Sequence, residues 1–313
     1  MKVLYGVQGT GQGHISRARA MAASLREWPV EVTWLFSGRE RDRLFDMTCF
    51  GDYQHRQGLS FTTRAGRIRV LETVFNNNLL RLYRDVRSLD LAPYDLIVTD
   101  YEPVTAWAAK LAGRRCIGIG HQYAFGKSTP VRGDDFVSRT IMRYFAPANV
   151  HVGLHWHPYS AEVLPPILDL PELAVAPGEH VLVYLPFEDQ DTVTELLQRF
   201  PGRRFIQYAN GLPHAIADNV TRCPASITGF KRDLASSGGV ICNSGFELIS
   251  ECLQWRKPVL TKPLRGQMEQ LSNALALDQL GYARVMEELC ADAIGDWLER
   301  GCNAPATSFS DVA

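Results

Sequence analysis

The stretch GVICNSGFELISE at residues 239–251 gives the clearest indication of the fold. Its short apolar run is bounded by small turn residues, which is typical of a strand buried on both faces. The turn at residues 243–245 then opens an amphipathic helix, whose first backbone N–H groups have no intrahelical partner. Such a helix start favours an anion, for example a diphosphate. The stretch therefore predicts a strand–turn–helix unit that binds phosphate.

Similar units extend in both directions from this stretch. Strands that alternate with helices predict a parallel sheet covered on both faces. The expected strands are Lys2–Val7, Val30–Phe36, Tyr94–Thr99, Arg115–Gly120, Val150–Trp156, His180–Leu185, Arg204–Ala209, Val240–Asn243 and Pro258–Thr261. The expected helices are Ile15–Glu27, Asp191–Phe200, Phe246–Gln254 and Gly266–Leu280. The fold class is α/β.

A cluster of prolines divides the chain into two such regions. Proline fixes φ and removes a backbone donor, so residues 158–178 are expected to form an extended linker. The first domain is predicted over residues 1–157 and the second over residues 179–300. Residues 301–313 lack apolar periodicity and are expected to be a disordered tail.

Composition excludes several classes of protein. The net charge of −1 argues against a nucleic-acid binder. No apolar stretch approaches the roughly 20 residues that cross a bilayer, and no signal-peptide core precedes the first strand. Seven cysteines form no Cys-x-x-Cys or Cys/His cluster, which argues against structural zinc and against a disulfide framework. We expect a cytoplasmic protein.

A second glycine-rich turn, GTGQGH at residues 9–14, joins the first strand to the first helix. Glycines at Gly11 and Gly13 let backbone amides approach an anion, although a tight turn can need them for packing alone. His14 at the helix start lies in a positive field that favours a neutral base; packing the turn is the alternative. The spacing departs from the dinucleotide fingerprint, but Arg39 after the next strand keeps an NADP-dependent reductase open.

Several polar residues follow strands or open helices where ligands bind in α/β proteins. Glu251 lies about one and a half turns into the helix after the Ser244-Gly245 turn, within reach of a ribose, although a lone helical glutamate is usually solvated. Glu269 and Gln270 could fix sugar hydroxyls. The remaining candidates are Phe230 for a flat base, Asp100 and Glu102 as acid–base groups, and His121, Gln122 and Tyr123 on the acceptor side.

The run SGFELISECLQWRKPVLTKPLRGQMEQLSNALALDQLG at residues 244–281 resembles the donor-binding half of GT-B glycosyltransferases. It is most similar to the group that contains the bacterial N-acetylglucosaminyltransferase of lipid II synthesis. GTGQGH likewise resembles that group's glycine loop. The segments LIVTDYEP and IGIGHQY look like a subfamily of uncharacterised microbial members. The resemblance spans nearly the whole chain and implies two Rossmann-like domains facing across a cleft.

The resemblance also implies roles for individual residues. Ser244, Gly245 and Phe246 would meet the diphosphate of a donor that is usually UDP-linked. Glu251 would hold the ribose, Phe230 the base, and Glu269 with Gln270 the sugar. Retaining members carry a glutamate eight positions before the ribose-binding one; Asn243 stands there, which favours inversion. Glu269 replaces a glutamine of the lipid II group, so the sugar stays open between a hexose and an N-acetylhexosamine.

We therefore expect an inverting hexosyltransferase with His14 as the base, Glu102 as the second choice, and Asp100 nearby. The Asp100-Tyr101-Glu102 order superficially suggests a metal site, but the helix starts already supply donors for phosphates, so we expect neither metal nor cofactor. The nucleotide sugar is a co-substrate. The acceptor stays open between a lipid-linked, a glycan and a small-molecule hydroxyl. A nucleotide-sugar epimerase, a non-catalytic sensor and the reductase are the alternatives.

One basic stretch suggests a further partner. Arginines alternate with apolar residues at Arg64, Arg67, Arg69, Arg81, Arg84 and Arg87, among Leu71, Val74, Phe75, Leu79 and Leu80. This pattern could touch anionic lipid at the inner face of the membrane. A solvated basic helix face is the more ordinary interpretation.

Overall fold

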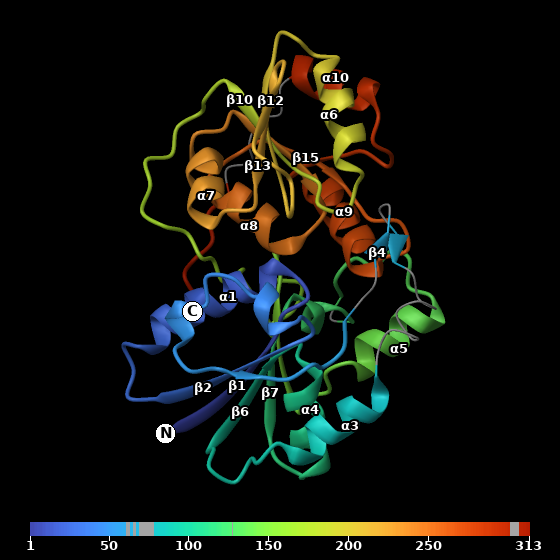
Figure 1. The fold of residues 1–313 in the computed structure, drawn as a ribbon. Helices are drawn as coiled ribbons and strands as arrows, with labels where there is room; N and C mark the ends of the chain where they lie inside the picture. The colour runs from blue at the N-terminus through green and yellow to red at the C-terminus, as the bar shows by residue number, and fades with distance from the viewer. Residues whose placement is uncertain (61–62, 65–66, 69–77, 127, 301–306) are drawn as a thin grey trace.

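The computed structural model describes residues 1–60, 63–64, 67–68, 78–126, 128–300 and 307–313. Two α/β domains lie one above the other in Figure 1, each with a seven-stranded sheet and helices on both of its faces. This arrangement confirms the predicted fold class.

The first sheet has the order β3-β2-β1-β6-β7-β8-β9, and its neighbouring strands all pair in parallel. Its strands are β1 (Lys2–Gln8), β2 (Glu31–Ser37), β3 (Gln54–His55), β6 (Leu96–Asp100), β7 (Cys116–Gly120), β8 (Val150–Leu154) and β9 (Val163–Leu164). Because β9 still pairs with β8, the first sheet extends past residue 157, where the sequence placed the end of the first domain. A separate hairpin pairs β4 (Thr63–Arg64) with β5 (Arg67–Ile68).

The second sheet has the order β12-β13-β11-β10-β14-β15-β16, parallel except for the β12–β13 pair. Its strands are β10 (His180–Tyr184), β11 (Arg204–Ala209), β12 (Ala215–Ala217), β13 (Val220–Pro224), β14 (Gly239–Asn243), β15 (Val259–Lys262) and β16 (Arg284–Val285). In both sheets the strand order reverses beside the first strand of the domain, between β1 and β6 and between β10 and β14. Ligands of open α/β sheets bind at such points, beyond the carboxyl ends of the strands.

Alternating side chains of each central strand face two helical layers. Val3, Tyr5 and Val7 of β1 pack under α1, whereas Leu4 faces α3 and α4. Helices of the first domain are α1 (Gln12–Leu25), α3 (Leu79–Ser88), α4 (Pro103–Leu111) and α5 (Phe136–Tyr144). Those of the second are α6 (Gln190–Gln198), α7 (Ile227–Ala235), α8 (Phe246–Gln254), α9 (Met268–Leu280) and α10 (Ala291–Arg300).

The two domains share apolar packing. Leu154 and Trp156, which end and follow β8, belong to the same buried cluster as Phe246 and Ile249 of α8. The Trp156 indole donates to the Ser250 hydroxyl of α8 at 2.8 Å. Helix α1 contacts α8 directly, so the loops that follow β1 and β14 lie face to face (Figure 1).

The end of the chain differs from the sequence prediction. Within residues 307–313, the Phe309 N–H donates to the Gln254 side chain at 2.7 Å, and Phe309 and Val312 pack on the shared cluster. The C-terminus lies beside α1 in Figure 1. The described part of the tail is therefore ordered against α8, because two apolar side chains find buried partners there. No helix in the described ranges is long and apolar enough to cross a membrane.

Candidate functional site

The first half of the site is the start of α1. This helix begins at Gln12, so Gly13 and His14 lie in its first turn, and its N-cap Gly11 offers no side chain. The first N–H groups of α1 can therefore serve an anion. A Cβ atom on Gly11 would meet nothing within 4 Å beyond its local backbone, so this helix start borders open space.

His14 contacts two charged side chains. Its Nδ1 lies 2.7 Å from Oδ1 of Asp100, the last residue of β6, and Asp100 also accepts from Nε and Nη2 of Arg17 at 2.7 and 2.6 Å. Burial opposes ionisation of Asp100, but the charges of Arg17 and His14 outweigh it and hold its pKa below the usual value. An ionised Asp100 accepts the Nδ1–H of His14 and leaves Nε2 able to accept a proton.

Asp100 and Glu102 are directed differently. Tyr101 between them has φ 51°, in the left-handed region, and this turns the chain sharply after β6. Glu102 is the N-cap of α4: its carboxylate accepts from the N–H groups of Val104 and Thr105 and from the Ser37 hydroxyl, at 2.8, 2.6 and 2.5 Å. The side chain is fully buried, and burial raises its pKa. Glu102 is therefore a structural cap, and the structure argues against it as an alternative base or metal ligand beside Asp100.

The second half of the site is the start of α8. Its N-cap is Gly245, again without a side-chain cap, and a Cβ atom there would also meet nothing within 4 Å beyond the local backbone. Ser244 is buried and fixes the turn through two hydrogen bonds. Its hydroxyl bonds the Thr261 hydroxyl at 2.9 Å, and its carbonyl accepts from the Asn273 amide at 2.9 Å. The Ser244 side chain thus holds the turn, while the backbone of Gly245 borders the space between the domains.

His121 and Phe246 join the two domains. Their rings stack with centroids 4.0 Å apart, and both side chains are buried. The His121 Nδ1 lies 2.8 Å from the Leu154 carbonyl, and its Nε2 lies 2.6 Å from Oδ1 of Asn273. Burial lowers the pKa of His121. These contacts link the two domains through His121, which differs from the predicted acceptor-side role.

The two residues predicted to bind the sugar, Glu269 and Gln270, have different partners. Glu269 lies in the first turn of α9 and accepts from the Gln122 amide of the first domain at 3.0 Å. Gln270 instead accepts the Leu264 N–H at 3.0 Å and braces its own loop. The structure thus brings Glu269 and Gln122 together across the two domains, whereas the Gln270 side chain supports the turn.

Glu251 is buried in α8, the helix that contacts α1. It forms an ion pair with Lys231 of α7 and a hydrogen bond with Ser16 of α1. Burial raises its pKa, although Lys231 and Ser16 oppose that effect. The residue expected to hold a ribose therefore lies between the domains, with a lysine beside it.

Two predicted aromatic ligand residues pack against protein groups, Tyr123 fully buried and Phe230 partly buried. The Tyr123 hydroxyl donates to the Ala146 carbonyl at 2.8 Å in a buried cluster. Phe230 lies inside α7 and meets Tyr184 and Tyr208 edge-on, with centroids 5.4 and 5.3 Å away. Tyr123 therefore does not line an acceptor space. Phe230 is part of α7 and partly buried, and its contact with a flat base stays a prediction.

Helix capping sets the site apart from the rest of the chain. Helices α3, α4, α5, α6 and α7 each have a side chain that accepts from their first turn. The starts of α1, α8 and α9 have no side-chain cap among the described residues, and these three begin at the predicted phosphate and sugar positions. Buried polar atoms without a hydrogen-bond partner occur in several parts of the described chain, and four of them lie at these helix starts or beside them: Gln12 Nε2, Gln122 Oε1, Asn243 Oδ1 and Gln267 Oε1. Buried polar groups normally have partners, so a polar ligand fits here.

Sequence reasoning missed two residues of this site. Arg17 is fully buried, and its Nη1 forms an ion pair with Glu247 in the first turn of α8. A Cβ atom on Gly13 would lie 3.3 Å from the Glu247 side chain. A signal existed, because Arg17 lies one helical turn after His14 on the same face as its buried neighbours.

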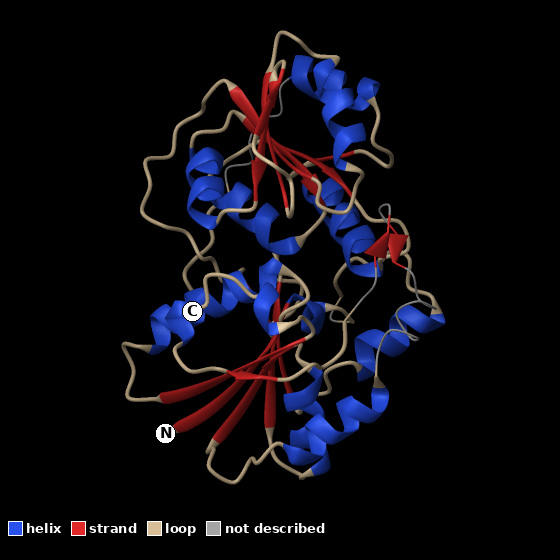
Figure 2. Ribbon diagram, in the orientation of Figure 1, coloured by secondary structure: helices blue, strands red, loops and turns tan. Residues whose placement is uncertain are grey.

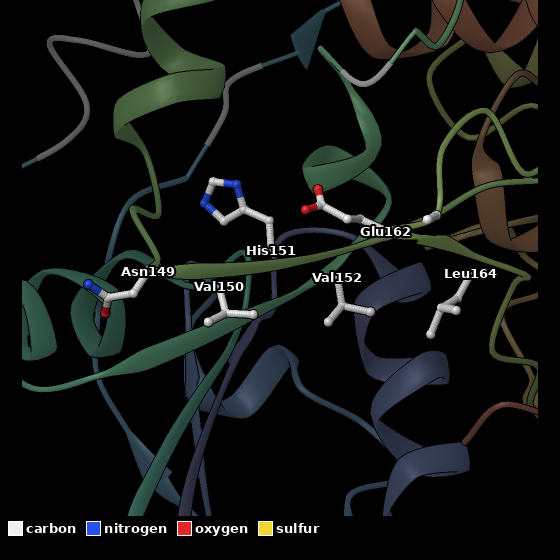
Figure 3. A pocket seen from close by; sticks show the side chains of 7 residues that line it. Asn149, Val150, His151, Val152, Glu162 and Leu164 are labelled. Atoms are coloured by element: carbon white, nitrogen blue, oxygen red, sulfur yellow. The ribbon is translucent and has the colours of Figure 1, made fainter.

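Two other surfaces lie outside this site. A hollow on β8 and β9 (Figure 3) is lined by Asn149, Val150, His151, Val152, Ala161, Glu162 and Leu164, none of them a predicted site residue. Of the basic stretch, residues 69–77 lie outside the described residues, as do the side chains of Arg64 and Arg67. On α3, Leu79, Leu80 and Tyr83 are exposed. Membrane contact stays a prediction that flotation with anionic vesicles would test.

A family model described as glycosyl transferase family 1 matches residues 1–301. The chain belongs to this family of glycosyltransferases. Solved structures agree on the fold, which is GT-B. The glycosyltransferase SnogD from Streptomyces nogalater has a TM-score of 0.57 at 15% identity, over 96% of this chain and 91% of that one. MurG from Acinetobacter baumannii has a TM-score of 0.57 at 16% identity, over 96% and 90%.

VinC, a glycosyltransferase solved in complex with dTDP, gives a TM-score of 0.57 at 16% identity, over 96% of this chain and 90% of that one. At these identities the likeness shows the fold alone. No protein with a curated description matches the sequence.

Proposed function

We propose that the protein transfers a hexosyl group from a nucleoside diphosphate sugar to an acceptor hydroxyl, with inversion and without a metal ion. The observation that carries this proposal is the meeting of two uncapped helix starts, one from each domain, beside the His14–Asp100 pair. One start serves the proton chemistry and the other the phosphates.

His14 is the proposed base. Its side chain is 15% exposed while that of Asp100 is wholly buried, so an acceptor can approach the imidazole but not the carboxylate. The acceptor hydroxyl gives its proton to Nε2 as its oxygen attacks the anomeric carbon, and the bond from that carbon to the diphosphate oxygen breaks. Asp100 keeps the ring in the required tautomer and stabilises the imidazolium that forms.

The leaving diphosphate would be held by the start of α8. Backbone N–H groups and the positive end of the helix stabilise negative charge as it develops there. Hydrogen bonds to a charged group contribute about 1.5–3 kcal/mol each, so several replace the contribution of an ion. This supports transfer without a metal, and the glycine at the N-cap lets the phosphates approach the backbone.

A glutamate at position 251 can accept hydrogen bonds from both ribose hydroxyls, which favours a ribonucleotide, and the resemblance to GT-B enzymes that use UDP-linked donors makes UDP the expected one. The named neighbours include a complex with dTDP, another pyrimidine nucleoside diphosphate. Glu269 and Gln122 offer a carboxylate and an amide to the hydroxyls of a hexose. The acceptor is a hydroxyl of a small molecule, a glycan or a lipid-linked sugar.

The test is a panel of UDP- and dTDP-sugars incubated with mixed acceptors, with products identified by mass and the new anomeric centre by NMR. The proposal predicts a glycoside of inverted configuration, formed equally in EDTA. A sugar nucleotide that changes configuration without transfer would indicate an epimerase. A retained configuration would exclude direct displacement by an acceptor activated at His14.

A further inference from the structure

Arg17 is the largest fully buried side chain in the described part of the chain. A buried cation is costly unless each of its donors is paired. Two of its nitrogens donate to Asp100 of the first domain, at 2.7 and 2.6 Å, and Nη1 lies against the Glu247 carboxylate of the second as an ion pair without hydrogen-bond geometry. One guanidinium thus connects the partner of the base to the helix proposed to hold the donor.

The same guanidinium touches the base. Its Nη2 lies 2.9 Å from Nδ1 of His14. With Glu247 in place, Arg17 balances one of two carboxylates, and a proton on His14 meets a net negative environment. Without Glu247, Arg17 and Asp100 cancel each other, and the same proton loses that attraction.

We infer that Arg17 is a positioning residue through which Glu247 of the donor-binding domain sets how readily the His14–Asp100 pair takes a proton. The base therefore reaches full strength only while the two domains are in contact. This inference rests on the proposed role of His14, and it adds a link between domain contact and acid–base chemistry.

Other titratable groups face this cluster. Tyr5 of β1 and Tyr123 are neutral near neutral pH because burial raises their pKa values, and burial lowers the pKa of His121. Glu269 of α9 also acts on Arg17 through its charge. Since Glu269 stays in every variant below, changes at Glu247 or Arg17 report on the proposed pair.

The experiment compares Arg17→Met, Arg17→Lys and Glu247→Gln with the unchanged chain. The ring titration of His14 is followed by NMR, with His14→Ala to assign its signal, and the acidic limb of the kcat/KM profile is measured beside it. Glu287→Gln is the matched control, because Glu287 also pairs across the domains, with Arg132 at 2.7 Å, and no contact joins it to His14.

Loss of the cation makes protonation easier, so Arg17→Met should move both midpoints up by about 1 to 3 pH units. Loss of the anion should move them down by about 1 unit in Glu247→Gln. Arg17→Lys keeps the positive charge, so its midpoints should lie close to those of the unchanged chain. Glu287→Gln should leave both midpoints in place.

The inference would be overturned if the midpoints of Arg17→Met and Glu247→Gln moved in the same direction. It would also be overturned if these variants lowered the rate at every pH and left the midpoints unchanged. If Arg17→Met fails to fold, the part-exposed Glu247→Gln still decides by the direction of its shift. NMR shifts as expected in a protein that transfers no sugar would uphold the Arg17 link and reject the proposed function.

Discussion

The start of α1 and the start of α8 face each other across the two domains, yet different side chains surround them. Around α1 the charged groups are already in contact, because His14 and Arg17 both bond Asp100 and lie 2.9 Å from each other. Around α8 and α9 the backbone is uncapped, as it is at α1, and amide atoms of Asn243 and Gln267 are buried without hydrogen-bond partners in the described chain. Gln12 Nε2 at the start of α1 is unpartnered too, so both halves can take a polar ligand, but the bonded acid–base pair lies on the α1 side. On this difference we base the proposal of chemistry in the first domain and donor binding in the second.

The largest effect should follow removal of the base. His14→Ala should lower kcat by about two to four powers of ten, since general base catalysis contributes that much. Donor affinity, measured by calorimetry, should stay nearly unchanged because the donor binds mainly to the other half. A fully active variant would remove His14 from the mechanism.

Asp100→Asn should destabilise the first half more than any other conservative change. Breaking a buried charge pair costs about 3–5 kcal/mol of unfolding free energy, because Arg17 loses its partner. The lowered pKa of Asp100 means that its contribution is present above the ordinary aspartate pKa and is lost as pH falls through the folded-state value. In urea unfolding, the difference in unfolding free energy between Asp100→Asn and the unchanged chain should therefore become smaller in acid. A difference in unfolding free energy that does not depend on pH would contradict the ionised state of Asp100.

In the second half, Glu251→Gln should weaken UDP binding by about 10- to 100-fold, the value of one or two hydrogen bonds to a charged acceptor. Binding of dTDP should weaken less, because its sugar has one ribose hydroxyl fewer. Glu188→Gln is a suitable control, since Glu188 pairs with Lys262 of the same domain. Equal losses for both nucleotides would argue against contact with the ribose.

The smallest effect should come from Glu102→Gln. As a helix cap it should cost about 1 kcal/mol of stability and leave kcat within a few-fold of the original. A loss comparable to that of His14→Ala would restore Glu102 as a base. The pair of variants therefore separates a buried cap from a reacting group.

The elements that were predicted well have a strong local pattern. Strand β11 and helix α8 have the predicted bounds, because an apolar run or a helical period is readable within a few residues. The His14 and Ser244 turns were found for the same reason. Glu102 was misassigned although proline at the next position is itself a helix-start signal. Pairs such as Arg17 with Glu247 depend on how two distant helices meet, which no local pattern encodes.

The central claim is that the start of α8, which faces the His14–Asp100 pair, holds a nucleoside diphosphate without a metal. The most direct measurement is calorimetric titration of the unchanged protein with UDP, other nucleoside diphosphates and NADPH, with and without EDTA. The account predicts binding of UDP that EDTA does not weaken, and weaker binding of the corresponding monophosphate. Binding of NADPH alone would show that the first glycine turn serves a dinucleotide and would contradict the donor site.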